Sequence, residues 1–249
     1  NLYDYSARYM EPALGRFTTL DPLAEKYYSV SLYVYCANNP VKFIDPDGRE
    51  IRIYRSQVLN EEKATVIIEV TGKLVNKSST EYTNEQLQSY AERLSSSISK
   101  IYTGEGENIN FRAEVNITVA TDQNGITESD HIFTLFNQGE LPGSEGKSTI
   151  AGNAVKGEKR INISKHILDR KEETSGEYAE TGKTENGLST FERTAAHELG
   201  HSATLTHPKP NSLNRNLMHQ AKVSNSGKIV TESQILQIEK AYLNKELNK

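Results

Sequence analysis

Residues 197–220 read HELGHSATLTHPKPNSLNRNLMHQ, and this stretch decides the fold that the sequence predicts. Four of the six histidines of the 249-residue chain lie between positions 197 and 219. His197 and His201 are four residues apart, so on a helix both imidazoles lie on one face and can hold one metal ion. Glu198 projects at a neighbouring angle, where a carboxylate can take a proton from a water molecule that the metal has acidified. The spacing predicts a catalytic Zn²⁺ site.

The third metal ligand is predicted to be His207, which follows His201 by six residues and is too far along to continue the same helical face. The chain must therefore turn sharply after Ala203 or Thr204 to bring His207 to the metal. If that turn failed, three weaker alternatives could supply the third ligand: His219, Glu232 and Glu239.

The whole stretch resembles the metzincin zinc peptidases, whose signature is HExxHxxGxxH followed by a Met-turn. The resemblance implies that Met218 is the Met-turn methionine. Thr204 departs from the signature because it stands where the family has a turn glycine, and a β-branched residue disfavours positive φ. Either the turn takes another conformation or the geometry of the third ligand is shifted. Gln220 stands where some members of the family carry a tyrosine that supports the transition state.

The chain from position 50 onward predicts an α+β fold. Alternating and β-branched residues predict strands in six stretches: 50–58, 63–79, 109–120, 131–136, 148–155 and 160–164. Capping boxes predict three helices, which start at Thr83, Ser189 and Thr231. The metzincin resemblance implies a mixed sheet with an active-site helix and a C-terminal helix. It also implies that an edge strand, near 149–154 or 160–164, binds a protein or peptide substrate in extended conformation.

The first 48 residues have a different composition. They hold seven of the 13 tyrosines and four of the seven prolines, and they predict short Tyr-rich strands broken by Asp-Pro and Asn-Pro turns. We therefore predict a boundary near position 49, with a β-rich segment at 1–48 and a second domain at 49–249.

Two blocks in this segment, YDYSARYMEPALGRFTTLDPLAEKYY (3–28) and YVYCANNPVKFIDPDGR (33–49), resemble the C-terminal end of the core of RHS (YD-repeat) proteins, large β-shells that carry toxins. The resemblance implies autoproteolytic release of the C-terminal cargo shortly after Gly48. Asp21 and Asp45 are the matching carboxylates, and Asp47 could replace Asp45. It also implies three interactions: with the RHS shell of the parent chain, with a cognate immunity protein and with a target cell to which the effector is delivered.

Composition excludes several other classes. A net charge of −4 without a run of Lys or Arg argues against a nucleic-acid partner. The longest strongly apolar stretch, 64–70, is far shorter than the roughly 20 residues that span a bilayer. Cys36 is the single cysteine, which excludes an intramolecular disulfide framework. The chain shows no signal peptide and reads as a fragment that begins at Asn1.

These observations predict a zinc-dependent endopeptidase, carried as the cargo of an RHS-type polymorphic toxin and secreted or delivered to a target cell. The alternative is a non-catalytic surface or adhesion module with a structural or degenerate zinc site, which His219 would close as a fourth ligand. A zinc hydrolase that acts on cell-wall peptide crosslinks is a further enzymatic alternative. His131 and His166 stand apart from the cluster and predict ordinary packing or surface positions.

Overall fold

The computed structural model describes residues 3–4, 9–11, 14, 16–18, 52–56, 62–120, 125–127, 130–147, 149–170, 181–184, 186–209, 215–220 and 226–248. The chain forms two compact units, Asn1–Arg49 and Glu50–Lys249. In the first unit, three short antiparallel strands form one sheet: β1 (Tyr3–Asp4), β2 (Tyr9–Glu11) and β3 (Arg16–Phe17). Asp21 and Asp45 lie outside the described residues, so their role in autoproteolysis stays a prediction.

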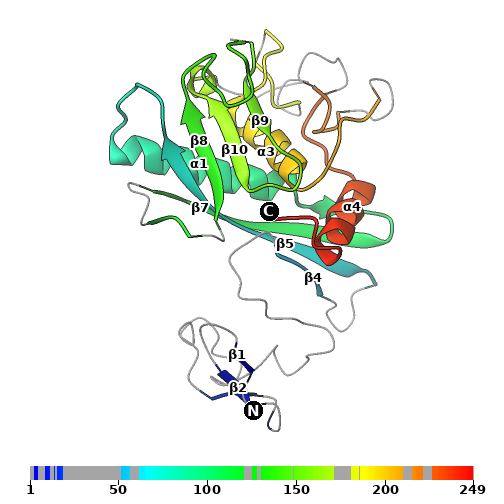
Figure 1. The fold of residues 1–249 in the computed structure, drawn as a ribbon. Coiled ribbons are helices and arrows are strands. Elements are labelled where there is room, and N and C mark those ends of the chain that lie inside the picture. The colour runs from blue at the N-terminus through cyan, green and yellow to red at the C-terminus, as the bar shows by residue number, and fades with distance from the viewer. Residues whose placement is uncertain are drawn as a thin grey trace. The chain divides into compact units, whose positions relative to one another are not determined.

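The second unit is built on a seven-stranded mixed sheet with the order β6-β7-β5-β8-β10-β9, and β4 also pairs with β5 (Figure 1). Its strands are β4 (Arg52–Ser56), β5 (Ala64–Asn76), β6 (Gly104–Glu105), β7 (Ile109–Val119), β8 (His131–Phe136), β9 (Gly152–Ala154) and β10 (Arg160–Ser164). The four strands β7, β5, β8 and β10 run parallel to one another, whereas β6, β4 and β9 pair antiparallel with β7, β5 and β10. The α+β prediction is confirmed.

The long strand β5 organises the sheet. It pairs with β7 over Ala64–Leu74 on one side, while on the other side it pairs first with β4 and then, from Gly72, with β8. A Cβ atom at Gly72 would lie 2.8 Å from the carbonyl oxygen of His131, where β8 joins β5. The absence of a side chain there allows one strand to serve two partners in succession.

Helices α1 (Asn84–Ile101) and α4 (Glu232–Leu243) begin at the predicted capping boxes, with Thr83 and Thr231 as N-caps. Helix α1 buries Ala91, Leu94 and Ile98 and contacts β7, and α4 contacts β4 and β7. No helix in the described part of the chain is long and apolar enough to cross a membrane.

Helix α3 (Phe191–Ser202) carries the HELGH sequence and is buried on nearly every side. It contacts α1, β9 and β10, and Figure 1 shows it beside the two strands. The predicted capping box at Ser189 is wrong, because the helix begins one residue later and the side chain of Thr190 accepts from the backbone N–H of Arg193. Glu192 does not cap the helix and instead pairs with Arg93 of α1 at 2.6 Å. A helix enclosed in this way holds its side chains in fixed positions.

Candidate metal centre and active-site cleft

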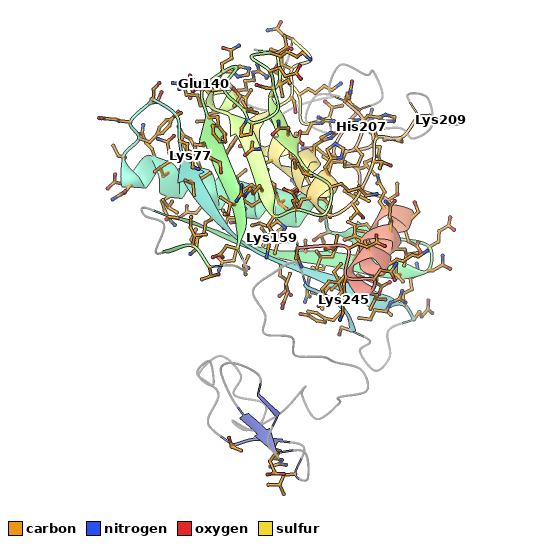
Figure 2. The ribbon with its side chains drawn as sticks, in the orientation of Figure 1. Lys77, Glu140, Lys159, His207, Lys209 and Lys245 are labelled. Atoms are coloured by element: carbon orange, nitrogen blue, oxygen red, sulfur yellow. The ribbon has the colours of Figure 1, made fainter. Side chains whose placement is uncertain are left out.

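Three histidines converge as the spacing predicts. The Nε2 atom of His207 lies 3.1 Å from Nε2 of His197 and 3.0 Å from Nε2 of His201. Three nitrogens bound at about 2.0–2.1 Å to one tetrahedral ion lie about 3.3 Å apart. The two separations from His207 are close to this value, and the ligand atoms of all three histidines lie within 4.8 Å of one another, so the residues fit a zinc ion. His197 is buried, His201 half-buried and His207 exposed, so the group opens towards solvent on the side of His207. Figure 2 shows His207 beside α3.

Backbone carbonyl groups fix the orientation of two imidazoles. Nδ1 of His197 lies 2.7 Å from the oxygen of Leu217, and Nδ1 of His201 lies 2.9 Å from the oxygen of Leu205. Since a carbonyl oxygen only accepts, each Nδ1 carries the proton and each Nε2 presents a lone pair. Burial lowers the pKa of His197 to about 3. The neutral imidazole is the form that binds a metal ion.

The turn after α3 accommodates Thr204 in a left-handed backbone conformation. Thr204 adopts φ 72°, a left-handed conformation that favours glycine over a β-branched residue. Its N–H donates to the oxygen of His201 at 2.9 Å, and the N–H of Leu205 donates to the oxygen of Gly200 at 2.8 Å. These two bonds form a Schellman motif with threonine at its C′ position. The third histidine therefore reaches the site through the standard turn, at a steric cost to Thr204.

Glu198 is a buried residue of the second unit and lines the same cleft as the three histidines. Its side chain is 7% exposed, and the backbone N–H of Ala154 in β9 donates to its carboxylate. Burial raises the pKa of Glu198 to about 8, while the Arg193 guanidinium and the Ala154 N–H oppose this shift. The carboxylate does not belong to the set of side chains that can hold the ion. This placement suits a proton carrier rather than a ligand.

Met218 is fully buried beneath α3. Its backbone N–H is held by the side chain of Asn216 at 2.9 Å. A Cβ atom at Gly200 would collide with Sδ of Met218 and lie 2.9 Å from the hydroxyl of Tyr102. Gly200 is therefore needed inside the HELGH sequence because it lets Met218 approach the helix at the position that precedes His201.

Arg193 is a residue of the site that the sequence reasoning missed. Its buried guanidinium donates to Gly227 O at 3.0 Å, Leu217 O at 3.1 Å, His219 O at 2.8 Å and Ser189 Oγ at 3.2 Å. Burial lowers its pKa to about 10, so the group remains charged at neutral pH. These bonds attach the segment around Met218 to α3. One sequence signal existed: Arg193 lies four residues before His197, on the same helical face.

The three histidines and Glu198 open into a cleft of about 950 Å³. Strand β9 lies at the edge of the sheet and lines this cleft, so of the two predicted edge strands, 149–154 contains the edge and 160–164 lies inside the sheet. The N–H of Ser164 in β10 donates to the oxygen of Ala151. Along an antiparallel pair of strands, residues alternate between those that bond to the partner strand and those that do not. The N–H and C=O groups of Gly152 and Ala154 therefore face away from β10. Gln220 and the half-buried His166 also line the cleft.

The alternative ligands lie elsewhere. Among the described residues, the group that can hold one ion contains His197, His201 and His207 and does not contain His219. Glu232 accepts from Asn108, and Glu239 pairs with Arg55 at 2.7 Å. His131 is fully buried, as predicted for a packing residue, with Nε2 3.2 Å from Ser202 Oγ.

Comparisons with known proteins give weak overall similarities. No family model matches the chain. Salivary gland surface protein 1 of Aedes aegypti is 50% identical over 48 residues, which are 19% of this chain, and the chain spans about 1% of that relative's length. Among solved structures, archaemetzincin from Methanopyrus kandleri is 18% identical, with a TM-score of 0.40 over 70% of this chain and 96% of that chain. Mature mirolysin of Tannerella forsythia, solved with a cleaved peptide, is 12% identical, with a TM-score of 0.40 over 70% of this chain and 91% of that chain.

Proposed function

We propose that the second unit is a zinc-dependent endopeptidase of the metzincin type. The observation that carries this proposal is the convergence of the Nε2 atoms of His197, His201 and His207 at a cleft lined by the edge strand β9. Catalytic zinc sites use three protein ligands and keep one position open, whereas structural sites are closed by a fourth. Within the described residues no fourth His, Cys, Asp or Glu joins the three. The donor set therefore favours catalysis over a structural role.

Zinc held by these nitrogens would polarise a peptide carbonyl and acidify a water molecule. The backbone groups of Gly152 and the carbonyl oxygen of Ala154 pair with an extended substrate and hold its scissile bond in the cleft, while the Ala154 N–H holds Glu198. The Glu198 carboxylate takes the proton of the attacking water and passes it to the leaving nitrogen.

The test compares Glu198→Gln with the wild type in the full chain. The variant should still bind about one zinc ion and lose about 10²- to 10⁴-fold in peptide cleavage, the usual contribution of a general base. Glu192→Gln is the matched control, because Glu192 lies on the same helix but pairs with Arg93 and should leave cleavage unchanged. Zinc content is measured by elemental analysis and cleavage with a labelled peptide library.

Each unfavourable result has a defined meaning. If zinc binds and the wild type cleaves no peptide, the alternative of a non-catalytic module with a structural zinc site is supported. Cleavage of cell-wall peptide crosslinks alone would support the other hydrolase. Unchanged cleavage by Glu198→Gln refutes the assigned role of this carboxylate.

The proposal extends to the biological setting through the sequence resemblance of residues 1–48 to the end of an RHS core. In this setting the peptidase is the cargo of a polymorphic toxin, released by Asp21 and Asp45, delivered to a target cell and neutralised by a cognate immunity protein. N-terminal sequencing of the product from the parent chain tests the release. A start near position 49 that disappears in Asp45→Asn supports it, and an uncut parent chain contradicts it.

A further inference from the structure

A cationic side chain lies on one wall of the cleft, apart from the metal-binding histidines. Arg170 follows the short 3-10 helix η4 (Lys165–Ile167) after β10 and lines the cleft together with His166, Leu188 and Ser189. Nη1 of Arg170 donates to the backbone oxygen of Ser189 at 3.2 Å. This bond holds the arginine against the segment that leads into α3. It is the one hydrogen bond of the guanidinium to the described residues, so the described part of the chain leaves its other N–H groups for a ligand.

The carboxylates nearest to Arg170 along the described chain are engaged or placed elsewhere. Glu192, in the first turn of α3, is paired with Arg93. Asp169 is exposed and does not line the cleft. Among the described residues that line the cleft, Glu198 is the one carboxylate, and it accepts from the Ala154 N–H. The arginine therefore faces the cleft without a carboxylate partner from the described part of the chain.

Partial burial of Arg170 strengthens the hydrogen bonds that a carboxylate ligand would make with its guanidinium. Arg170 is half-buried, and burial lowers the pKa of its guanidinium without removing its charge. A carboxylate that enters the cleft would form charge-assisted, bidentate hydrogen bonds with a group that has already lost part of its hydration. Arg193, the other arginine that lines the cleft, already donates to three carbonyl groups and a hydroxyl, so it offers less to a ligand.

We propose that Arg170, with His166 beside it, forms a subsite for a substrate carboxylate and directs the peptidase to acidic peptides. This inference rests on the proposed function and adds to it a substrate class. The carboxylate can belong to an Asp or Glu side chain or to the C-terminus of a short peptide, and the experiment below separates these two sources.

The direction of β9 places this subsite relative to the cleaved bond. Glu198 contacts Ala154 at the C-terminal end of β9, whereas Ala151, just before β9, accepts from Ser164, which leads into η4 and Arg170. A peptide that pairs antiparallel with β9 therefore runs from Glu198 towards Arg170. In that antiparallel orientation the recognised carboxylate belongs to a residue that follows the cleaved bond.

The experiment uses the full zinc-loaded chain and matched fluorogenic peptides. These peptides carry Glu, Gln or Lys after the cleaved bond, each with a free or an amidated C-terminus. We expect kcat/KM for Glu to exceed that for Gln by about 10- to 100-fold, as for hydrogen bonds between charged groups. Arg170→Gln should abolish this preference, Arg170→Lys should retain part of it and Arg170→Glu should reverse it in favour of Lys. Arg160→Gln is the control, since it removes an equal charge from an exposed position on β10.

A binding measurement separates this inference from the proposed function. The same peptides are titrated by fluorescence anisotropy into the zinc-loaded Glu198→Gln chain with and without Arg170→Gln. Carboxylate-dependent binding that Arg170→Gln removes supports the subsite even if the wild type cleaves nothing, and in that case the proposed activity fails alone. Cleavage without any carboxylate preference overturns the subsite and leaves the peptidase standing. A preference that follows the amidation state assigns the C-terminus as the recognised group.

Discussion

Arg193 and His197 donate to the same carbonyl oxygen, that of Leu217, at 3.1 and 2.7 Å. The guanidinium thus fixes the acceptor that in turn fixes the imidazole. Groups that orient a metal ligand through hydrogen bonds commonly lower the metal affinity when they are removed. Arg193 is a positioning residue, because it acts on the metal site through Leu217.

We predict that Arg193→Lys weakens zinc binding by about 10- to 100-fold, the usual effect of losing an outer-shell partner. A lysine offers one point charge and cannot donate to Gly227, Leu217 and His219 from one planar group. Competition with a chromophoric chelator measures the zinc dissociation constant. Arg93→Lys is the control, because Arg93 pairs with Glu192 outside the metal site. Equal zinc affinities in the two variants would show that the contact is structural only.

A second prediction concerns the backbone at Thr204. A non-glycine residue in the left-handed region costs about 1–2 kcal/mol, and β-branching adds to the strain. Thr204→Gly should therefore have a free energy of unfolding about 1 kcal/mol above that of Thr206→Gly, which removes the same side chain from an exposed position without positive φ. Urea denaturation measures both variants with zinc bound. A Thr204→Gly chain that is the less stable of the two would show that the buried threonine side chain outweighs the strain.

The sequence allowed much of the site to be predicted because its signals are local. An i, i+4 histidine pair needs only a helix, and the capping boxes at Thr83 and Thr231 satisfy backbone groups within one turn. The box at Ser189 failed because the neighbouring Thr190 also caps well, while Glu192 finds a stronger partner in Arg93. The local sequence did not distinguish Ser189 from Thr190 as the N-cap, and the ion pair between Glu192 and Arg93, which are far apart in the sequence, decided between them.

Arg193 and the edge strand could not be predicted for a related reason. The acceptors of Arg193 are mainly backbone carbonyl groups 24 to 34 residues away, and every residue type supplies a carbonyl. Likewise, 149–154 and 160–164 have similar patterns, and only their pairing shows that β9 ends the sheet while β10 lies between β8 and β9. Both features depend on tertiary contacts that leave little trace in residue identity.

A third prediction tests the close approach of β9 to α3. A Cβ atom at Gly152 would lie 2.8 Å from Cγ2 of Thr194 and 3.0 Å from Cγ of Glu198. Gly152→Ala should therefore displace the edge strand that we propose binds the substrate and reduce kcat/KM by at least about tenfold, since small displacements in an active site cost this much. Thr194→Ser removes the nearest atom and keeps the hydroxyl that bonds Ser189 Oγ. The double variant should recover part of the activity, and no recovery would assign the loss to another cause.

The final prediction is a pH dependence of stability from His131, which lies outside the metal group. Burial, assisted by Lys159 and opposed by Asp130, lowers the pKa of His131 from 6.5 to about 3. Between about pH 3 and pH 6.5 the imidazole of His131 binds a proton in the unfolded chain and stays neutral in the folded chain. The free energy of unfolding should therefore fall as pH decreases from about 6.5 towards 3, by at most about 1.4 kcal/mol per pH unit for this one group.

His131→Gln removes this titration and retains a donor for Ser202 Oγ, which lies 3.2 Å from Nε2 of the imidazole. Urea unfolding of the metal-free chains should show a flatter pH profile for His131→Gln than for the wild type, because the histidines of the metal site contribute equally to both. His166→Gln should change the slope less, since His166 is half-buried and burial lowers its pKa to a smaller extent. Parallel profiles for wild type and His131→Gln would mean that His131 accepts a proton in the folded state, so that its burial does not oppose protonation.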